Sequence, residues 1–178
     1  MNNSNSPKTI GLRIPDNPDD IQRYIFEVLG ELGKYITLTK ALERRVKLIL
    51  IELITNSIKH STDPEALLQL TINHPQLTIE KIDVGLQIVF EGAEQIPFKE
   101  LNKTLQISFS ENNSHDIKVT DHYKFRFLDN YKDEMSINHF PEHFGFFIIT
   151  VASDSFEYEH DPLLKKKHLY RAGESIAD

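Results

Sequence analysis

The chain has 178 residues, of which 39% are hydrophobic, and a formal net charge of -7. This length is typical of one domain, and the apolar fraction is sufficient for a buried core. The acidic balance argues against nucleic acid as a partner, because proteins that bind the phosphate backbone usually present a basic face. The sequence has no cysteine, which excludes disulfides and thiolate chemistry.

The amino-terminal residues are polar, and no apolar run approaches the roughly 20 residues that span a bilayer. We therefore expect neither a signal peptide nor a membrane-spanning helix, and we expect a cytoplasmic protein with no membrane partner. Residues 1–8 are expected to be a disordered leader. Residues 9–173 are expected to form a single domain, followed by a tail at residues 174–178.

The first third of the chain predicts one strand followed by two helices. Residues 9–14 alternate between polar and apolar side chains, which is typical of a half-buried strand. Apolar residues at helical spacing predict a helix from about Asp20 to Leu32 and a second helix from about Lys40 to His60. The second helix has apolar residues on more than one side, so we expect it to be buried.

After residue 66 the hydrophobic pattern changes to a period of two. Residues 66–91 predict three antiparallel strands, with breaks at residues 74–75 and 83–85. Residues 96–101 predict a short helix. Residues 108–138 are polar, charged and only weakly periodic, and no clear element is predicted there.

The last part of the chain predicts a helix and a hairpin. The helix is expected to begin near Pro141, and the two strands are expected at residues 155–159 and 167–171. The order of all these elements predicts an α+β fold, a two-layer sandwich of helices packed on a mixed, mostly antiparallel sheet.

The second predicted helix holds one carboxylate, Glu52, inside an apolar run. An ionised carboxylate among Leu and Ile side chains costs several kcal/mol unless a cation, hydrogen bonds or a ligand compensates it. Asn56 lies one turn further along, and Lys59 and His60 continue the same row, so these polar side chains project to one side of the helix. This row is the strongest candidate for a functional site.

Residues 51–61, IELITNSIKHS, resemble the N box of the histidine-kinase-like ATPases, which has the pattern Glu-Leu-x-x-Asn-Ala-x-x-His. Within that superfamily the anti-sigma-factor serine kinases are the most similar group. The resemblance implies ATP and Mg²⁺ as cofactors, with Glu52 as the catalytic base, Asn56 as the metal ligand and Lys59 near phosphate. One amide ligand is sufficient, because Mg²⁺ keeps several waters and binds phosphate oxygens as well.

The two glycine motifs of that superfamily are matched only in part. The adenine-binding motif Asp-x-Gly-x-Gly is expected near residues 86–98, where Gly92 corresponds to its first glycine, Glu91 is the nearest carboxylate and the Asp is absent. The glycine-rich phosphate lid is represented by Gly145, at the start of the third helix, where helix amides would face phosphate. Losing the Asp and the lid would raise the Kd for a nucleotide about a thousandfold.

Two other features have simpler explanations. His139 and His143 are four residues apart, but Pro141 interrupts the helix that would align them, so we do not expect zinc. Aromatic residues are frequent between residues 109 and 147. They are expected to be packing residues, or to form a hydrophobic plug or dimer surface in place of a nucleotide pocket.

Three interpretations stay open. The first is an ATP-binding regulatory protein that resembles the anti-sigma-factor kinases and transfers a phosphoryl group to a serine of a protein partner. The second is a degenerate, nucleotide-free member of the fold that acts as a protein–protein interaction module. The third is an unrelated α+β domain. Family analogy implies a homodimer and a partner such as a sigma factor or an anti-sigma antagonist.

Overall fold

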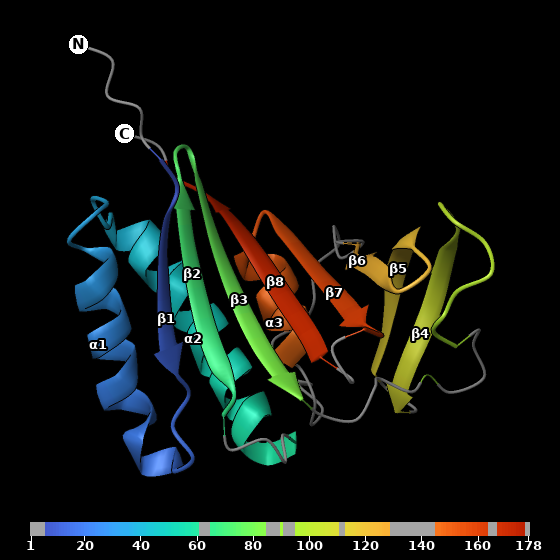
Figure 1. Ribbon diagram of the computed structural model, residues 1–178, viewed down its shortest axis with the longest axis horizontal. Helices are drawn as coiled ribbons and strands as arrows, with labels where there is room; N and C mark the ends of the chain where they lie inside the picture. The colour runs from blue at the N-terminus through green and yellow to red at the C-terminus, as the bar shows by residue number, and fades with distance from the viewer. Residues whose placement is uncertain are drawn as a thin grey trace, which may run out of the picture.

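A computed structural model describes residues 6–60, 65–84, 90, 95–110, 113–128, 145–163 and 167–176 of the chain. Eight strands form one sheet, and the helices lie on one of its faces (Figure 1). Every strand pairing that the structure describes is antiparallel. The expected α+β arrangement of helices on a mostly antiparallel sheet is confirmed.

The elements at the start of the chain form as the sequence predicts. The side chain of Asn17 accepts a hydrogen bond from the backbone amide of Asp19 at 3.1 Å and caps the first short helix. Thr39 caps the long helix, because its hydroxyl accepts from the amide of Leu42 at 3.2 Å. These elements are β1 (Lys8–Arg13), the 3-10 helix η1 (Pro18–Asp20), α1 (Ile21–Leu32) and α2 (Lys40–His60).

The predicted hairpin after α2 is present. It consists of β2 (Leu67–Asn73) and β3 (Gln76–Val84), which pair along the whole length of β2. Leu68, Leu70 and Ile79 are fully buried on the face that the helices cover. The third strand expected in this part of the sequence falls on residues 86–90, of which the structure describes Phe90 alone.

One expectation for the middle of the chain is wrong, and the region without a predicted element contains strands. Residues 96–101 form an irregular segment and not a helix, and Phe98 is buried within it. The weakly periodic region contains β5 (Asn113–Asp121) and β6 (Lys124–Phe127), and β4 (Thr104–Ser110) begins before it and ends within it. Apolar residues do alternate within these strands, and Ile107, Ile117, Val119, Phe125 and Phe127 are buried. Each run is short, β6 has only four residues, and the residues between the runs are polar and charged, so the alternation is easily overlooked.

The predicted helix and hairpin at the end of the chain are confirmed. They are α3 (Gly145–Ala152), β7 (Ser155–Asp161) and β8 (Lys167–Ser175). The expected start of the helix near Pro141 lies outside the described residues. β8 continues past the expected domain boundary at residue 173, and both Glu174 and Ile176 are buried.

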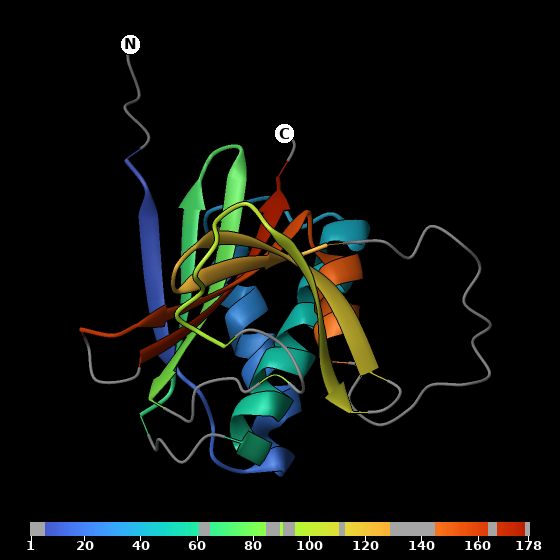
Figure 2. The ribbon, with the colours of Figure 1, turned by 90° about the vertical axis from the view of Figure 1, so that its right-hand side faces the viewer.

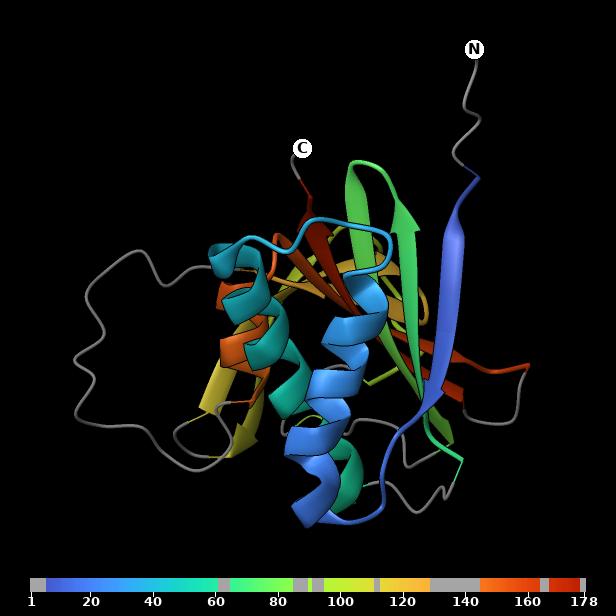
Figure 3. The same ribbon diagram turned by 90° about the vertical axis from the view of Figure 1, so that its left-hand side faces the viewer.

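The sheet has the order β1-β2-β3-β8-β7-β6-β5-β4, so the last hairpin lies in its centre, beside β3. Figure 3 shows α1 and α2 side by side on one face of the sheet, over the part that β1 to β3 form. Figure 2 shows the other end, where β4, β5 and β6 are strongly rotated relative to β1 and β2. No helix in the described part of the chain is long and apolar enough to cross a membrane.

Candidate functional site

The candidate site lies where α3 begins against the middle of α2. A Cβ atom built on Gly145 would lie 2.8 Å from Oε2 of Glu52 and 3.0 Å from Nδ2 of Asn56. Any other residue at this position would require one of those side chains to move. Glu52, Asn56 and Gly145, which the sequence singled out in two distant segments, are therefore in one place.

The two helices run in opposite directions along this contact. Gly145 at the start of α3 lies at Glu52 and Asn56, whereas the carbonyl of Ala152 at its end accepts a hydrogen bond from Arg45 near the start of α2, at 2.8 Å. The start of an α-helix has backbone amides without intrahelical partners and is the positive end of the helix dipole. The described part of α3 begins at Gly145, and this residue lies against the carboxylate of Glu52.

Glu52 is a carboxylate of the site whose pKa departs from its ordinary value. It is half-buried, and burial raises its pKa above the ordinary value, while the charge of Lys59 acts in the opposite direction. A raised pKa brings a carboxylate nearer to neutral pH, where a general base is most effective. No hydrogen bond joins the side chain of Glu52 or Asn56 to another described residue.

The other predicted site residues are not part of the contact at Gly145 as the structure describes it. Lys59 is exposed on the last turn of α2, and its positive charge acts to lower the pKa of Glu52. Glu91 and Gly92 lie outside the described residues, so their roles stay predictions. His60, which ends the polar row on α2, is exposed as well.

The structure draws attention to a carboxylate that the sequence analysis did not single out. Asp83 is buried near the end of β3, on the face that the helices cover, and its Oδ2 lies 2.5 Å from Nζ of Lys81. The sequence at residues 83–85 is Asp-Val-Gly, which has the Asp-x-Gly spacing. The hydrophobic pattern indicates a strand break there and puts the expected motif one strand later. The observed end of the β2–β3 hairpin makes Asp83 a second candidate for the adenine-binding Asp.

An aromatic cluster lies beside the start of α3. The ring of Phe146 is 5.4 Å from that of Phe127 and 5.8 Å from that of Phe156. Further rings extend the cluster over β6 and into the segment that precedes β4, so this half of the sheet has an aromatic core. The added rings are Phe90, Phe98, Phe125 and Tyr158.

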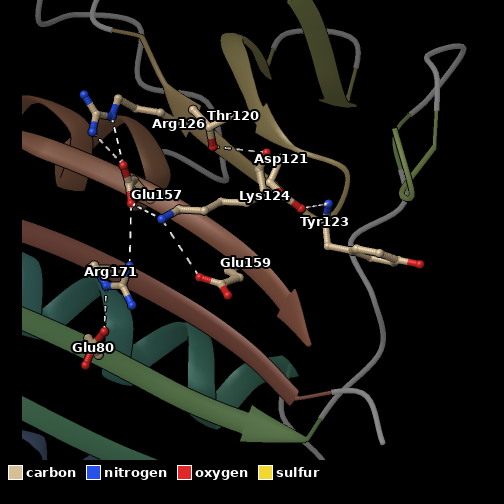
Figure 4. Close-up of polar contacts among 9 residues, drawn as sticks. All are labelled: Glu80, Thr120, Asp121, Tyr123, Lys124, Arg126, Glu157, Glu159 and Arg171. Carbon is tan, nitrogen blue, oxygen red and sulfur yellow. Dashed lines mark hydrogen bonds and ion pairs between the residues drawn. The ribbon is translucent and has the colours of Figure 1, made fainter. Parts of the chain in front are cut away.

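The opposite face of the sheet carries a network of ion pairs (Figure 4). Nε of Arg171 lies 2.6 Å from Oε1 of Glu80. The carboxylate of Glu157 forms ion pairs with Nη2 of Arg126 at 2.7 Å and with Nζ of Lys124 at 2.8 Å. Opposite charges thus alternate across β3, β8, β7 and β6. Because the charges in this network compensate one another, it provides no strongly basic or acidic patch, and the helix-covered side is the better candidate for a site.

The residues at the site fit a magnesium–nucleotide complex better than a metal bound by protein alone. The described residues include no group of three or more His, Cys, Asp or Glu side chains that could hold a metal ion. His139 and His143 lie outside them. A magnesium ion that keeps waters and phosphate oxygens needs one or two protein oxygens, which Asn56 and Glu52 can supply.

No family model and no curated protein matches this chain. The contact between α2 and α3 and the resemblance of residues 51–61 to the N box are the two indications of function.

Proposed function

We propose that this protein is an ATP-binding regulatory protein that resembles the anti-sigma-factor kinases, and that it transfers a phosphoryl group to a serine of a protein partner. The observation that supports this proposal is the contact of Gly145 with Glu52 and Asn56. It joins the N-box-like helix to the start of a second helix, where backbone amides can bind phosphate.

Each residue has a separate role in the proposal. The amide oxygen of Asn56 would hold Mg²⁺, which offsets phosphate charge when it is bound. Glu52 accepts the proton of the serine hydroxyl as the new oxygen–phosphorus bond forms and the bond to ADP breaks. Gly145 lets phosphate approach the first amides of α3, because it has no side chain to exclude it. Lys59 adds a positive charge one turn beyond Asn56.

Base recognition has two candidate residues. Asp83 would accept the adenine amino group, in competition with its ion pair to Lys81. Glu91, with Gly92 beside it, is the alternative from the sequence. Because breaking the pair with Lys81 costs free energy, we expect ATP to bind weakly.

The proposal includes a cytoplasmic location, where ATP and Mg²⁺ are available, and a homodimeric state. The partner would be a sigma factor or an anti-sigma antagonist, by analogy with the kinases that the sequence resembles. Phosphorylation of a serine would add a charge of about −2 to that partner and so change its binding.

Isothermal titration calorimetry with ATP tests the proposal. Wild-type protein is expected to bind ATP weakly in the presence of Mg²⁺, and Asn56→Ala is expected to weaken this binding. Thr55→Ala, on the same turn of α2, is the matched control and should bind as wild type does. Tight binding that Asn56→Ala leaves unchanged would refute the role of Asn56.

A second function is an interaction module that binds no nucleotide. Two observations favour it: Lys81 already neutralises the buried Asp83, and Phe146 packs into the aromatic core directly after Gly145. In this case no nucleotide-bound metal compensates Glu52, and Lys59 is the described cation that acts on it. Folded protein that gives no binding heat at millimolar ATP would favour the module over the kinase.

A further inference from the structure

The contact between α2 and α3 has a second polar end, away from the candidate site. Arg45 precedes Glu52 by about two helical turns, and Ala152 follows Gly145 by about the same distance, so each pair shares one face of its helix. Nε of Arg45 donates to the carbonyl of Ala152 at 2.8 Å. The last turn of α3 is thus fixed to α2 through one guanidinium group.

The same guanidinium group is shared by two carboxylates. Nη2 of Arg45 lies 2.6 Å from Oδ1 of Asp154 and 2.9 Å from Oε2 of Glu174. The other oxygen of Asp154 accepts from the backbone amide of Ser175 at 2.6 Å. Arg45 therefore connects α2, the end of α3 and the end of β8.

Glu174 is the unusual member of this cluster. Its side chain has 0% exposure, and neither of its carboxylate oxygens accepts a hydrogen bond. Two charged groups act on it, Arg45 from α2 and Asp154 from the connection between α3 and β7. The residue that pairs with it on the neighbouring strand β3 is the apolar Leu77. Burial raises its pKa to about 8, Arg45 opposes this, and Asp154 adds to it.

Asp154 behaves in the opposite way. Its hydrogen bond with Arg45 holds its pKa below the ordinary value, so this carboxylate is ionised at neutral pH. When Glu174 ionises as well, two negative charges compete for one guanidinium group. The position of Arg45, and with it the end of α3, then depends on a single proton.

We propose that Arg45, Asp154 and Glu174 form a proton-sensitive latch that sets the position of α3 and thereby regulates the contact of Gly145 with Glu52 and Asn56. Arg45 is a positioning residue in this scheme. The helix α3 has 8 residues, and Ile149 in its middle is fully buried. Since packed interiors transmit small displacements, a shift at Ala152 reaches Gly145. The regulatory role rests on the proposed function, whereas the coupling within α3 does not.

Nuclear magnetic resonance of the protein without nucleotide tests the coupling. Between pH 6 and about pH 9.5, the amide resonances of Gly145 and Ala152 are expected to shift together, with a midpoint near 8. The conservative change Glu174→Gln should abolish this titration. Arg44→Met removes the same charge from an exposed neighbouring position on α2 and should leave it intact. A Gly145 resonance that does not titrate, or that titrates equally in Glu174→Gln, would overturn the latch.

Titration with ATP and Mg²⁺ tests the regulatory role separately. Arg45→Met is expected to raise the Kd about tenfold through misplacement of α3, with partial recovery in Arg45→Lys and no change in Arg44→Met. If the wild type binds no ATP, the proposed function fails, while the resonance of Gly145 still reports on the latch. If ATP binds and Arg45→Met leaves the Kd unchanged, the latch has no regulatory role.

Discussion

At the scale of single residues, the environment of Glu52 explains why a carboxylate occurs in an apolar helix. Its pKa is raised by burial and lowered in part by Lys59. Gly145, the first described residue of α3, lies against this carboxylate. A carboxylate in this position is partly compensated without ligand by the charge of Lys59, and its raised pKa is consistent with the role of base that we propose for it.

Replacing Glu52 should separate binding from catalysis. Glu52→Gln keeps the shape of the side chain and removes its basic form, so we expect ATP to bind within a few-fold of wild type while hydrolysis of ATP falls by about a hundredfold or more. In the absence of the partner, water replaces the serine hydroxyl as the acceptor, so the release of phosphate measures the rate. Glu43→Gln, on an earlier turn of α2, is the control with an unchanged rate. Equal rates for wild type and Glu52→Gln would exclude Glu52 as the base.

Replacing Gly145 should affect the site more than the fold. In Gly145→Ala the new Cβ would displace Glu52 or Asn56, so we expect the Kd for ATP to rise about tenfold, or about 1.4 kcal/mol. Gly30→Ala is the matched control, since Gly30 lies inside α1 and a Cβ atom added there would have no atom within 4 Å. It should raise the free energy of unfolding by about 0.5–1 kcal/mol and leave the Kd unchanged. An unchanged Kd in Gly145→Ala would show that phosphate does not bind here.

At the scale of elements, the long and strongly periodic segments were predictable from the sequence. The helix α2 and the strands of the β2–β3 hairpin have clear periods, and their predicted positions are confirmed. The strands β4 to β6 were not predicted because their alternating apolar runs are short and are separated by polar and charged residues. The short helix expected at residues 96–101 is absent because Phe98 is held in the aromatic core instead.

The packing of α3 against α2 could be predicted only in part. The sequence identified Glu52, Asn56 and Gly145, but their contact depends on the antiparallel arrangement of the two helices, which no local pattern encodes. Arg45 and Glu174 gave no signal, since a charged residue near a helix start and another near the end of a strand are ordinary features. Their shared contact and the burial of Glu174 follow from tertiary structure alone.

The latch predicts how stability depends on pH. Glu174 has a pKa of about 8 in the folded protein and an ordinary value of 4.5, so between these values the folded state holds a proton that the unfolded state has lost. The contribution of this residue to the free energy of unfolding is therefore full below pH 4.5 and decreases as the pH rises toward 8. Urea unfolding at several pH values should show this decrease in wild type and a flatter profile in Glu174→Gln. Parallel profiles would contradict the assignment to Glu174.

At the scale of the whole molecule, the sheet order brings the site together. The final hairpin inserts between β3 and β6, so α3, which leads into β7, lies beside α2 on the same face of the sheet (Figure 1). The buried Asp83 also lies on that face, at the end of β3. Glu52, Asn56, Gly145 and Asp83 thus lie on the helix side of the sheet, where we propose the magnesium–nucleotide site, while the ion pairs of β3, β8, β7 and β6 lie on the other face (Figure 4).

The most direct test of nucleotide binding at this site replaces Mg²⁺ by paramagnetic Mn²⁺ in the presence of ATP and follows the broadening of resonances by nuclear magnetic resonance. We predict that the side-chain amide of Asn56 and the backbone amide of Gly145 broaden first, and only when ATP is present. Leu163, at the exposed turn after β7, serves as the internal reference and should stay sharp. Broadening that spares Asn56 and Gly145, or that is the same without ATP, would contradict a magnesium–nucleotide site between α2 and α3.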